Sequence, residues 1–518
     1  MSNLTENLIN LEHLDLITVF KHEPELEYAF KHVFTQESVY HSLLFSDRRE
    51  LHQAVGDALE ALLADLPAYS EVDIALFLAY HFEQSGDKPR AVKYLKQAAA
   101  NAGQTYANEE AKALNERALT LLELKDYPAR WEILASLEII LDRLGQRERQ
   151  AHILTQMQTL AQLIEDSALL ATTHNRRAAY FDKVSQYQAA AEAAEVGLRQ
   201  ARRSGNAQLE AQSLNSLALA AWRRFDYFQV QRWALEALEA LKGGSDPDGH
   251  VTSLFHLSKA SYRLGQYDLA LHYIQATQQL TQETNNLDGQ ATSQMIQGWV
   301  HQRLGDYERA AESYRAKLEI RRRMGNRYGE ATALSHLGWL AYDQAQAEAG
   351  LDYCRQALDI SYDVNDRENE AYALSGLALN YERLGQYDLA AESYGAAHYI
   401  HTEIGATTLA IFDQCGLARI ALAEGDREAM RLLITSVVNW IRTGKAQKFW
   451  DPWIIYWSSY QVLTALGDLE AARSILLEAR HLLDQRAEAI SDLDLRDCFL
   501  NKVEVNQAII QAATQVCV

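Results

Sequence analysis

Proline is scarce in this chain, and its scarcity is the first guide to the fold. The 518 residues include six prolines, whereas average usage of about 5% would give several times more. Long stretches without proline are rich in Ala, Leu, Glu, Gln and Arg, which favour helix. The sequence therefore predicts an all-α protein.

Cysteine is also scarce, and the four cysteines are widely spaced, without a CxxC pair. Such spacing is typical of a reducing cytoplasm rather than of a disulfide scaffold. The N-terminal stretch MSNLTENLINLEHLDL lacks a basic segment followed by an apolar core, as a signal peptide would have. No apolar run reaches about 18 residues. We therefore expect a cytoplasmic protein with no membrane span.

Basic residues are outnumbered by acidic ones. The chain has 49 Lys and Arg against 70 Asp and Glu, which gives a formal net charge of −21. This balance keeps a protein soluble and argues against general binding of nucleic acid or anionic membranes. The expected partner is therefore neither nucleic acid nor a membrane.

What the chain does have is an internal repeat. The octapeptide RLGQYDLA occurs at Arg263–Ala270 and again at Arg383–Ala390, 383 − 263 = 120 positions later. Residues aligned with its glycine recur every 40 residues, and weaker copies follow at Gly467 and precede at Gly86. The registered positions are Gly145, Ser185, Phe225, Gly265, Gly305, Ala345, Gly385 and Gly425. A period of this length indicates a stacked repeat architecture.

The sequence of each unit predicts two amphipathic helices joined by a turn. In the best-formed units, glycine at the turn can adopt a left-handed backbone conformation and end the first helix. The next residue is Asp or Gln, and Asp suits the cap of the second helix. The unit at Ala345 lacks both the glycine and the following aromatic residue, so we expect an irregular turn there.

These residues resemble tetratricopeptide repeats, in which small residues, a turn glycine and aromatic residues recur at fixed offsets. One unit carries the pattern at Gly298, Gly305, Tyr307, Ala310 and Tyr314. The resemblance implies a right-handed α-solenoid of about ten helix pairs, closed by a C-terminal capping helix.

The two ends carry a second resemblance. The stretch beginning PELEYAFKHVFTQESVYHSLLF and the stretch LDLRDCFLNKVEVNQAII resemble the segment that follows the ATPase in bacterial signalling proteins of the STAND type. The implied organisation is a winged-helix-like or helical piece (1–70), entry helix pairs (71–130), a repeat array (131–480) and a capping helix (481–518). An ATPase or cyclase module is an implied partner.

No phosphate-binding loop of the form GxxxxGK[ST] is present in the sequence, so the resemblance does not carry ATP hydrolysis to this chain. His398 and His401 have the i, i+3 spacing of zinc ligands, but no third or fourth ligand is visible nearby. We expect no catalytic residue, cofactor or metal, and hence no enzyme.

Four tryptophans gather where the repeat period breaks, and two interpretations stay open. They are Trp440, Trp450, Trp453 and Trp457. They either fill the junction as core residues or form a partly exposed aromatic surface for a partner, since tryptophan is enriched at binding hot spots.

A cation recurs two residues before most turns. The ladder consists of Arg143, Lys183, Arg223, Arg263, Arg303 and Arg383, and only Asp343 and Ala423 interrupt it. In one interpretation, a long basic residue merely suits the last turn of a helix. In the other, the ladder binds an acidic peptide, with Trp299 and Trp339 as apolar anchors beside it.

The sequence thus predicts a protein–protein interaction module, a scaffold or sensing arm of a bacterial signalling system that binds a protein or acidic peptide in the concave groove. The alternatives are a ligand- or peptide-gated regulator and the non-catalytic regulatory arm of a STAND ATPase or cyclase protein.

Overall fold

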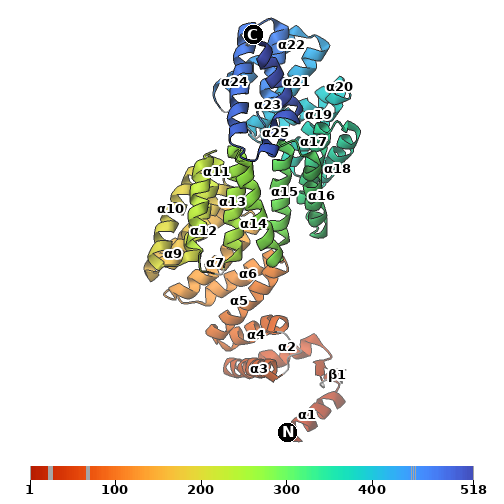
Figure 1. Ribbon diagram of the computed structural model, residues 1–518. Coiled ribbons are helices and arrows are strands. Elements are labelled where there is room, and N and C mark those ends of the chain that lie inside the picture. Colours follow the sequence, from red (N-terminus) through yellow and green to blue (C-terminus); the bar gives the residue numbers. More distant parts are fainter. Residues whose placement is uncertain are drawn as a thin grey trace. The chain divides into compact units, whose positions relative to one another are not determined.

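The computed structural model describes residues 2–21, 27–65, 71–244, 246–444, 446, 449 and 451–516. The chain divides into two compact units, Met1–Arg177 and Ala178–Val518. Nearly all described residues are helical (Figure 1), which confirms the predicted α-solenoid. No helix of the described residues is long and apolar enough to cross a bilayer.

The first unit contains the one hairpin among the described residues. Strand β1 (Ile17–Lys21) pairs with β2 (Glu27–Phe30) in antiparallel register, with Ile17 opposite Phe30. The helices of this unit are α1 (Ser2–His13), α2 (Val33–Ser42), α3 (Phe45–Asp65), α4 (Glu71–Ser85), α5 (Lys88–Gln104), α6 (Asn108–Leu121), α7 (Tyr127–Arg143) and α8 (Arg147–Ile164). The next helix, α9 (Ser167–Lys183), crosses into the second unit.

The second unit is a run of antiparallel helix pairs. Its repeat helices are α10 (Tyr187–Ser204), α11 (Ala207–Arg223), α12 (Tyr227–Ala240), α13 (Pro247–Leu264), α14 (Tyr267–Glu283), α15 (Leu287–Arg303), α16 (Tyr307–Arg323), α17 (Arg327–Asp343), α18 (Ala347–Asp363), α19 (Arg367–Arg383), α20 (Tyr387–Glu403), α21 (Thr407–Glu424) and α22 (Arg427–Arg442). Odd-numbered helices from α7 onward are the first helices of the pairs.

The 40-residue period is visible in the backbone of the turns. All eight registered turn residues have positive φ, from 57° at Ala345 to 77° at Gly265. We expected an irregular turn at Ala345. That expectation is wrong, because the flanking helices α17 and α18 are 17 residues long, like α15 and α16. Helix packing on both sides therefore imposes the left-handed conformation even where the side chain disfavours it.

Small residues let the paired helices approach closely. A Cβ atom added at Gly298 would lie 2.2 Å from the Tyr314 ring, and one at Gly416 would lie 2.3 Å from the Tyr394 ring. Both tyrosines are fully buried. In both pairs the missing side chain of the glycine makes room for the ring, within one repeat at Gly298 and between consecutive repeats at Gly416.

The C-terminal region differs from the single capping helix that we expected. After α23 (Trp453–Leu466) and α24 (Leu469–Glu488), the chain forms two short helices, α25 (Leu493–Asn501) and α26 (Glu504–Val516). The buried Asn506 amide donates to the Phe499 carbonyl at 2.8 Å. This bond satisfies a carbonyl left free by the end of α25.

These C-terminal helices pack back against turns of the repeat array, as the blue and green segments of Figure 1 show. Arg486 Nη1 donates to the Arg263 carbonyl at 3.0 Å, and Asp268 accepts the Ser491 backbone N–H at 2.7 Å. Phe499 packs between Tyr267 and Trp453, with both ring centroids 6.2 Å away.

The tryptophan cluster belongs mainly to this core. Trp440 and Trp453 are buried, and Trp457 is half-buried against the same hydrophobic cluster. Trp450 lies outside the described residues. The packing interpretation is confirmed for Trp440 and Trp453.

Candidate functional site

The first helices of the second unit enclose a pocket of about 280 Å³, here called the central pocket. Its wall comes from five consecutive first helices, α13, α15, α17, α19 and α21. The lining residues are Tyr262, Arg263, Met295, Trp299, Gln302, Arg303, Tyr328, Thr332, His336, Trp339, Glu368, Asn369, Tyr372 and Leu409. Aromatic side chains predominate among the larger ones, as is typical of sites that bind apolar groups.

The aromatic side chains of this pocket are held in place by hydrogen bonds. The Trp339 indole stacks on Tyr372 with centroids 4.6 Å apart, and its N–H donates to the Tyr372 carbonyl at 3.0 Å. The Trp299 N–H donates to His336 Nε2 at 3.0 Å. Burial holds the pKa of His336 well below its usual range, so the ring is neutral and can accept this bond.

A buried lysine lies behind the central pocket. Lys317 is 2% exposed, and its Nζ donates to Thr332 Oγ1 at 2.9 Å and lies 3.4 Å from His336 Nδ1. Burial lowers the pKa of Lys317 to about 7, with a smaller contribution from the positive charge of Arg321. The lysine therefore loses its proton far more readily than an exposed lysine does.

Most arginines of the predicted ladder are engaged within the protein. Arg223 forms a bidentate pair with Asp182 at 2.9 and 3.0 Å. Arg303 is buried and pairs with Asp451, while Asp343 lies 3.8 Å away. Arg383 contacts Glu504 on α26 at 3.2 Å.

Two further cations of the ladder, like Arg223 and Arg383, do not line the central pocket. In the first unit, Arg143 donates to the Gly103 carbonyl at 2.8 Å. Lys183, at the end of α9, is exposed.

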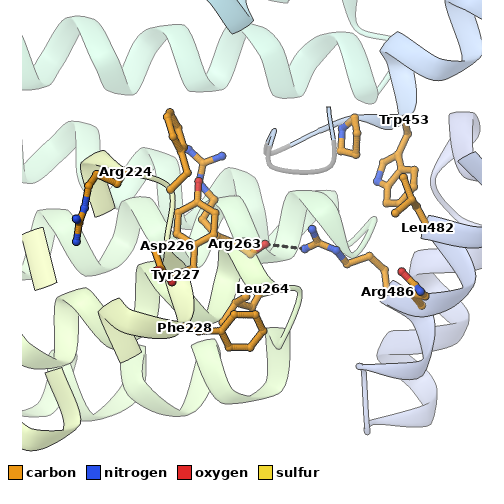
Figure 2. Close-up of a pocket in the computed structure, with 12 residues that line it drawn as sticks. Arg224, Asp226, Tyr227, Phe228, Arg263, Leu264, Trp453, Leu482 and Arg486 are labelled. Atoms are coloured by element: carbon orange, nitrogen blue, oxygen red, sulfur yellow. Dashed lines mark hydrogen bonds between the residues drawn. The ribbon is translucent and has the colours of Figure 1, made fainter. Parts of the chain in front are cut away.

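Arg263 differs from its neighbours in the ladder. Its guanidinium lies over Trp222 at 5.3 Å and over Tyr227 at 5.8 Å, and it forms no ion pair with a carboxylate in the described part of the chain. Arg263 lines both the central pocket and a larger neighbouring pocket, shown in Figure 2. It is therefore the ladder cation best placed to meet a ligand.

A third pocket, of about 350 Å³, adjoins the central one through Gln302 and Arg303. Here called the C-terminal pocket, it is lined by both ion pairs of the ladder that involve C-terminal residues, Arg303 with Asp451 and Arg383 with Glu504. Burial raises the pKa of Asp343, in the same wall, to about 6 despite the nearby Arg303.

The structure thus brings four of the predicted site residues together: Arg263, Arg303, Trp299 and Trp339 all line the central pocket. Sequence reasoning missed Tyr372 and His336. The 40-residue period does not mark Tyr372, because the equivalent residue of the preceding unit is Thr332. Nothing in the sequence pattern marks His336.

The two histidines with metal-ligand spacing form other contacts. His401 Nδ1 lies 2.7 Å from the Asp413 carboxylate, and His398 Nδ1 lies 2.9 Å from the Ala410 carbonyl oxygen. Within the described ranges, no group of three or more His, Cys, Asp or Glu side chains could hold a metal ion.

Comparison with known proteins bears on the fold. Residues 291–323 match the tetratricopeptide repeat family. A Rap protein complexed with competence and sporulation factor is similar over 69% of this chain and 99% of its own, with 15% identity and a TM-score of 0.51. At this identity the likeness shows a shared fold.

A STAND protein with a tetratricopeptide repeat sensor, from Pyrococcus horikoshii, also matches. It covers 91% of this chain and 68% of its own at 15% identity, with a TM-score of 0.48. No curated protein matches the chain.

Proposed function

We propose, from the premise that this chain is a tetratricopeptide-repeat protein, that its second unit binds a peptide segment of a partner protein in the central pocket. The observation that carries the proposal is the aromatic lining contributed by five consecutive first helices. Stacked repeats present extended surfaces of this kind for binding.

The lining of the pocket carries charges of both signs, which bears on the expected orientation of the peptide. Arg263, on α13, forms no ion pair with a carboxylate of the described residues, and Glu368 comes from α19. An apolar side chain inserted beside Trp299 and Tyr372 would place an adjacent acidic residue near Arg263. A guanidinium binds a carboxylate strongly because two N–H groups can donate in parallel.

This proposal assigns fewer cations of the ladder to the binding of an acidic peptide than the sequence analysis did. Arg223, Arg303 and Arg383 already pair with Asp182, Asp451 and Glu504, so an acidic peptide would have to displace those carboxylates. We therefore assign the recognition of a peptide carboxylate to Arg263.

The experiment is selection of peptides from a random library against the full chain, followed by affinity measurement with variants. Tyr328→Ala is the informative change, because Tyr328 lines the pocket while its side chain is 53% exposed, so folding should be unaffected. We expect at least tenfold weaker binding in Tyr328→Ala and in Arg263→Gln.

Arg223→Gln is the matched control, since it removes an equivalent ladder arginine outside the pocket. Its affinity should equal that of the wild type. Unchanged affinity in both Tyr328→Ala and Arg263→Gln, or selected peptides without an apolar residue next to an acidic one, would contradict the proposal.

A ligand-gated regulator is the second candidate, and the C-terminal pocket favours it. The two pockets adjoin at Gln302 and Arg303, so a carboxylate of the bound peptide that extends into the C-terminal pocket would compete with Asp451 and Glu504 for Arg303 and Arg383. The contacts that hold α26 would then weaken. Faster amide exchange in α26 on addition of the selected peptide is the expected result, and unchanged exchange there would exclude gating by that peptide.

A further inference from the structure

A larger pocket lies beside the central one and differs from it in the charged residues of its lining. This side pocket, of about 730 Å³, lies between the α11–α12 turn, α13 and the C-terminal helices (Figure 2). Its lining residues are Arg224, Phe225, Asp226, Tyr227, Phe228, Arg263, Leu264, Pro452, Trp453, Leu482, Gln485 and Arg486. Three are arginines and one is acidic, in a chain whose net charge is −21.

Two of these arginines are brought together by the fold from residues 223 positions apart. The Arg486 side chain crosses the turn at Gly265, where an added Cβ would lie 2.3 Å from its Cδ. Its Nη1 donates to the Arg263 carbonyl at 3.0 Å, the dashed line in Figure 2. Across the described residues, neither guanidinium forms an ion pair with a carboxylate.

The one carboxylate of the lining is engaged elsewhere. Asp226 Oδ1 accepts the Gln229 backbone N–H at 3.2 Å and caps the start of α12. Arg224 contacts the Gln188 amide oxygen, at 3.5 Å, and extends away from the other two arginines in Figure 2. Asp226 keeps its negative charge but forms no ion pair with Arg263 or Arg486, so the three arginines leave the lining with an excess of positive charge.

A buried hydroxyl without a partner supplies an independent observation. Tyr227 is 6% exposed, and its phenolic oxygen has no hydrogen-bond partner among the described residues. Burial raises the pKa of Tyr227, although Arg263 and Arg486 act in the opposite direction, so the phenol is a neutral donor. A buried polar group without a partner is costly, so the Tyr227 hydroxyl would gain from a ligand oxygen that reaches it from the pocket.

We propose that the side pocket binds a small phosphate-bearing anion through Arg263, Arg486 and the Tyr227 hydroxyl. Two guanidinium forks and a hydroxyl offer several donors, which suits a group with several acceptor oxygens and more than one negative charge. Exposed Phe228 and the half-buried Leu264 and Leu482 line the remaining space, which is apolar enough for an organic substituent.

The inference is independent of the peptide proposal, because Arg486 and Tyr227 line the side pocket and not the central one. Failure of either proposal therefore leaves the other standing. Arg263 lines both pockets, so it is not used to decide between them.

The test is calorimetric titration of the full chain, at low salt, with inorganic pyrophosphate and separately with phenyl phosphate. We expect saturable binding of at least one of them, weakened at least tenfold in Arg486→Gln. Arg473→Gln, an exposed arginine on the same helix, is the matched control and should bind like the wild type. Tighter binding of phenyl phosphate would identify an organic ester as the source, and tighter binding of pyrophosphate an inorganic one.

Tyr227→Phe is a second variant, which tests the proposal even if Arg486→Gln fails to fold. Removing a hydroxyl that has no partner should leave the melting temperature unchanged or slightly higher, while phosphate binding weakens several-fold. No saturable binding of either compound up to about 5 mM, or equal affinity in wild type and Tyr227→Phe, would overturn the proposal.

Discussion

At the residue scale, two arginines at equivalent repeat positions have opposite environments. Arg303 is buried between Asp451 and Asp343, whereas Arg223 pairs with Asp182 at the surface. Removing one partner of a buried pair leaves an uncompensated charge. A surface pair contributes little.

We therefore predict that Arg303→Gln lowers the free energy of unfolding by about 3 kcal/mol or more, whereas the same change at Arg223 lowers it by less than about 1 kcal/mol. Urea denaturation of the two variants and the wild type measures both values. Equal losses in the two variants would show that burial does not distinguish these sites.

Burial of Lys317 makes the free energy of unfolding depend on pH. Its pKa falls from 10.5 to about 7 on folding because it is buried. Between these values the unfolded chain binds the extra proton and the folded chain does not, so stability rises with pH across this window. Below it, both states are protonated and this slope disappears.

We predict that Lys317→Met raises the melting temperature at pH 7.5, because the apolar side chain needs no deprotonation on folding. The difference from wild type should shrink as the pH approaches 10. Thermal melts at several pH values measure it, with Lys125→Met, at an exposed lysine, as the control. A difference that stays constant with pH would argue against this origin.

At the scale of the element, the closing helices α25 and α26 are expected to stabilise the repeat array. Phe499 is 1% exposed and packs between Tyr267 and Trp453. Deleting residues 491–518 would uncover this apolar surface. We predict a lower melting temperature and aggregation for the truncated protein.

Thermal melts with light scattering test this prediction, and Phe499→Ala is the point variant that goes with it. Truncation of a buried phenylalanine typically costs about 3–5 kcal/mol. If neither the truncation nor the point variant melts earlier than wild type, α25 and α26 are only a tail.

Some features of the helices and turns could be predicted from the sequence, and others could not. The turn positions from Gly145 to Gly425 followed from a strict period, because every unit repeats the same local chemistry. The environment of Arg303 did not follow, since its partner Asp451 lies 148 positions away. The division of the C-terminal segment into two helices was missed for a related reason, because the bond from Asn506 to Phe499 forms only once both segments pack.

At the scale of the whole second unit, contacts between distant parts of the chain should make unfolding cooperative. An open array of repeats is held by neighbour contacts alone and can unfold stepwise. Here Arg486 contacts residue 263 and Ser491 contacts Asp268. These bonds join helices that are far apart in the sequence of the array.

We predict that the second unit unfolds in urea as a single transition. Tryptophan fluorescence should report it, because eight of the nine tryptophans lie in Ala178–Val518. In the chain truncated before Ser491, the fluorescence transition should broaden or split. A single sharp transition in both proteins would show that neighbour contacts suffice.

The contacts between the C-terminal helices and the array have a consequence for how this gene can change. In an open solenoid, duplication of one 40-residue unit merely adds length. Here Arg303 meets Asp451, Arg383 meets Glu504 and Arg486 meets residue 263, so the number of units between these residues must match the span that they bridge. A unit added or lost between Arg383 and Asp451 would separate all three pairs at once. These contacts therefore constrain the number of units in this part of the chain.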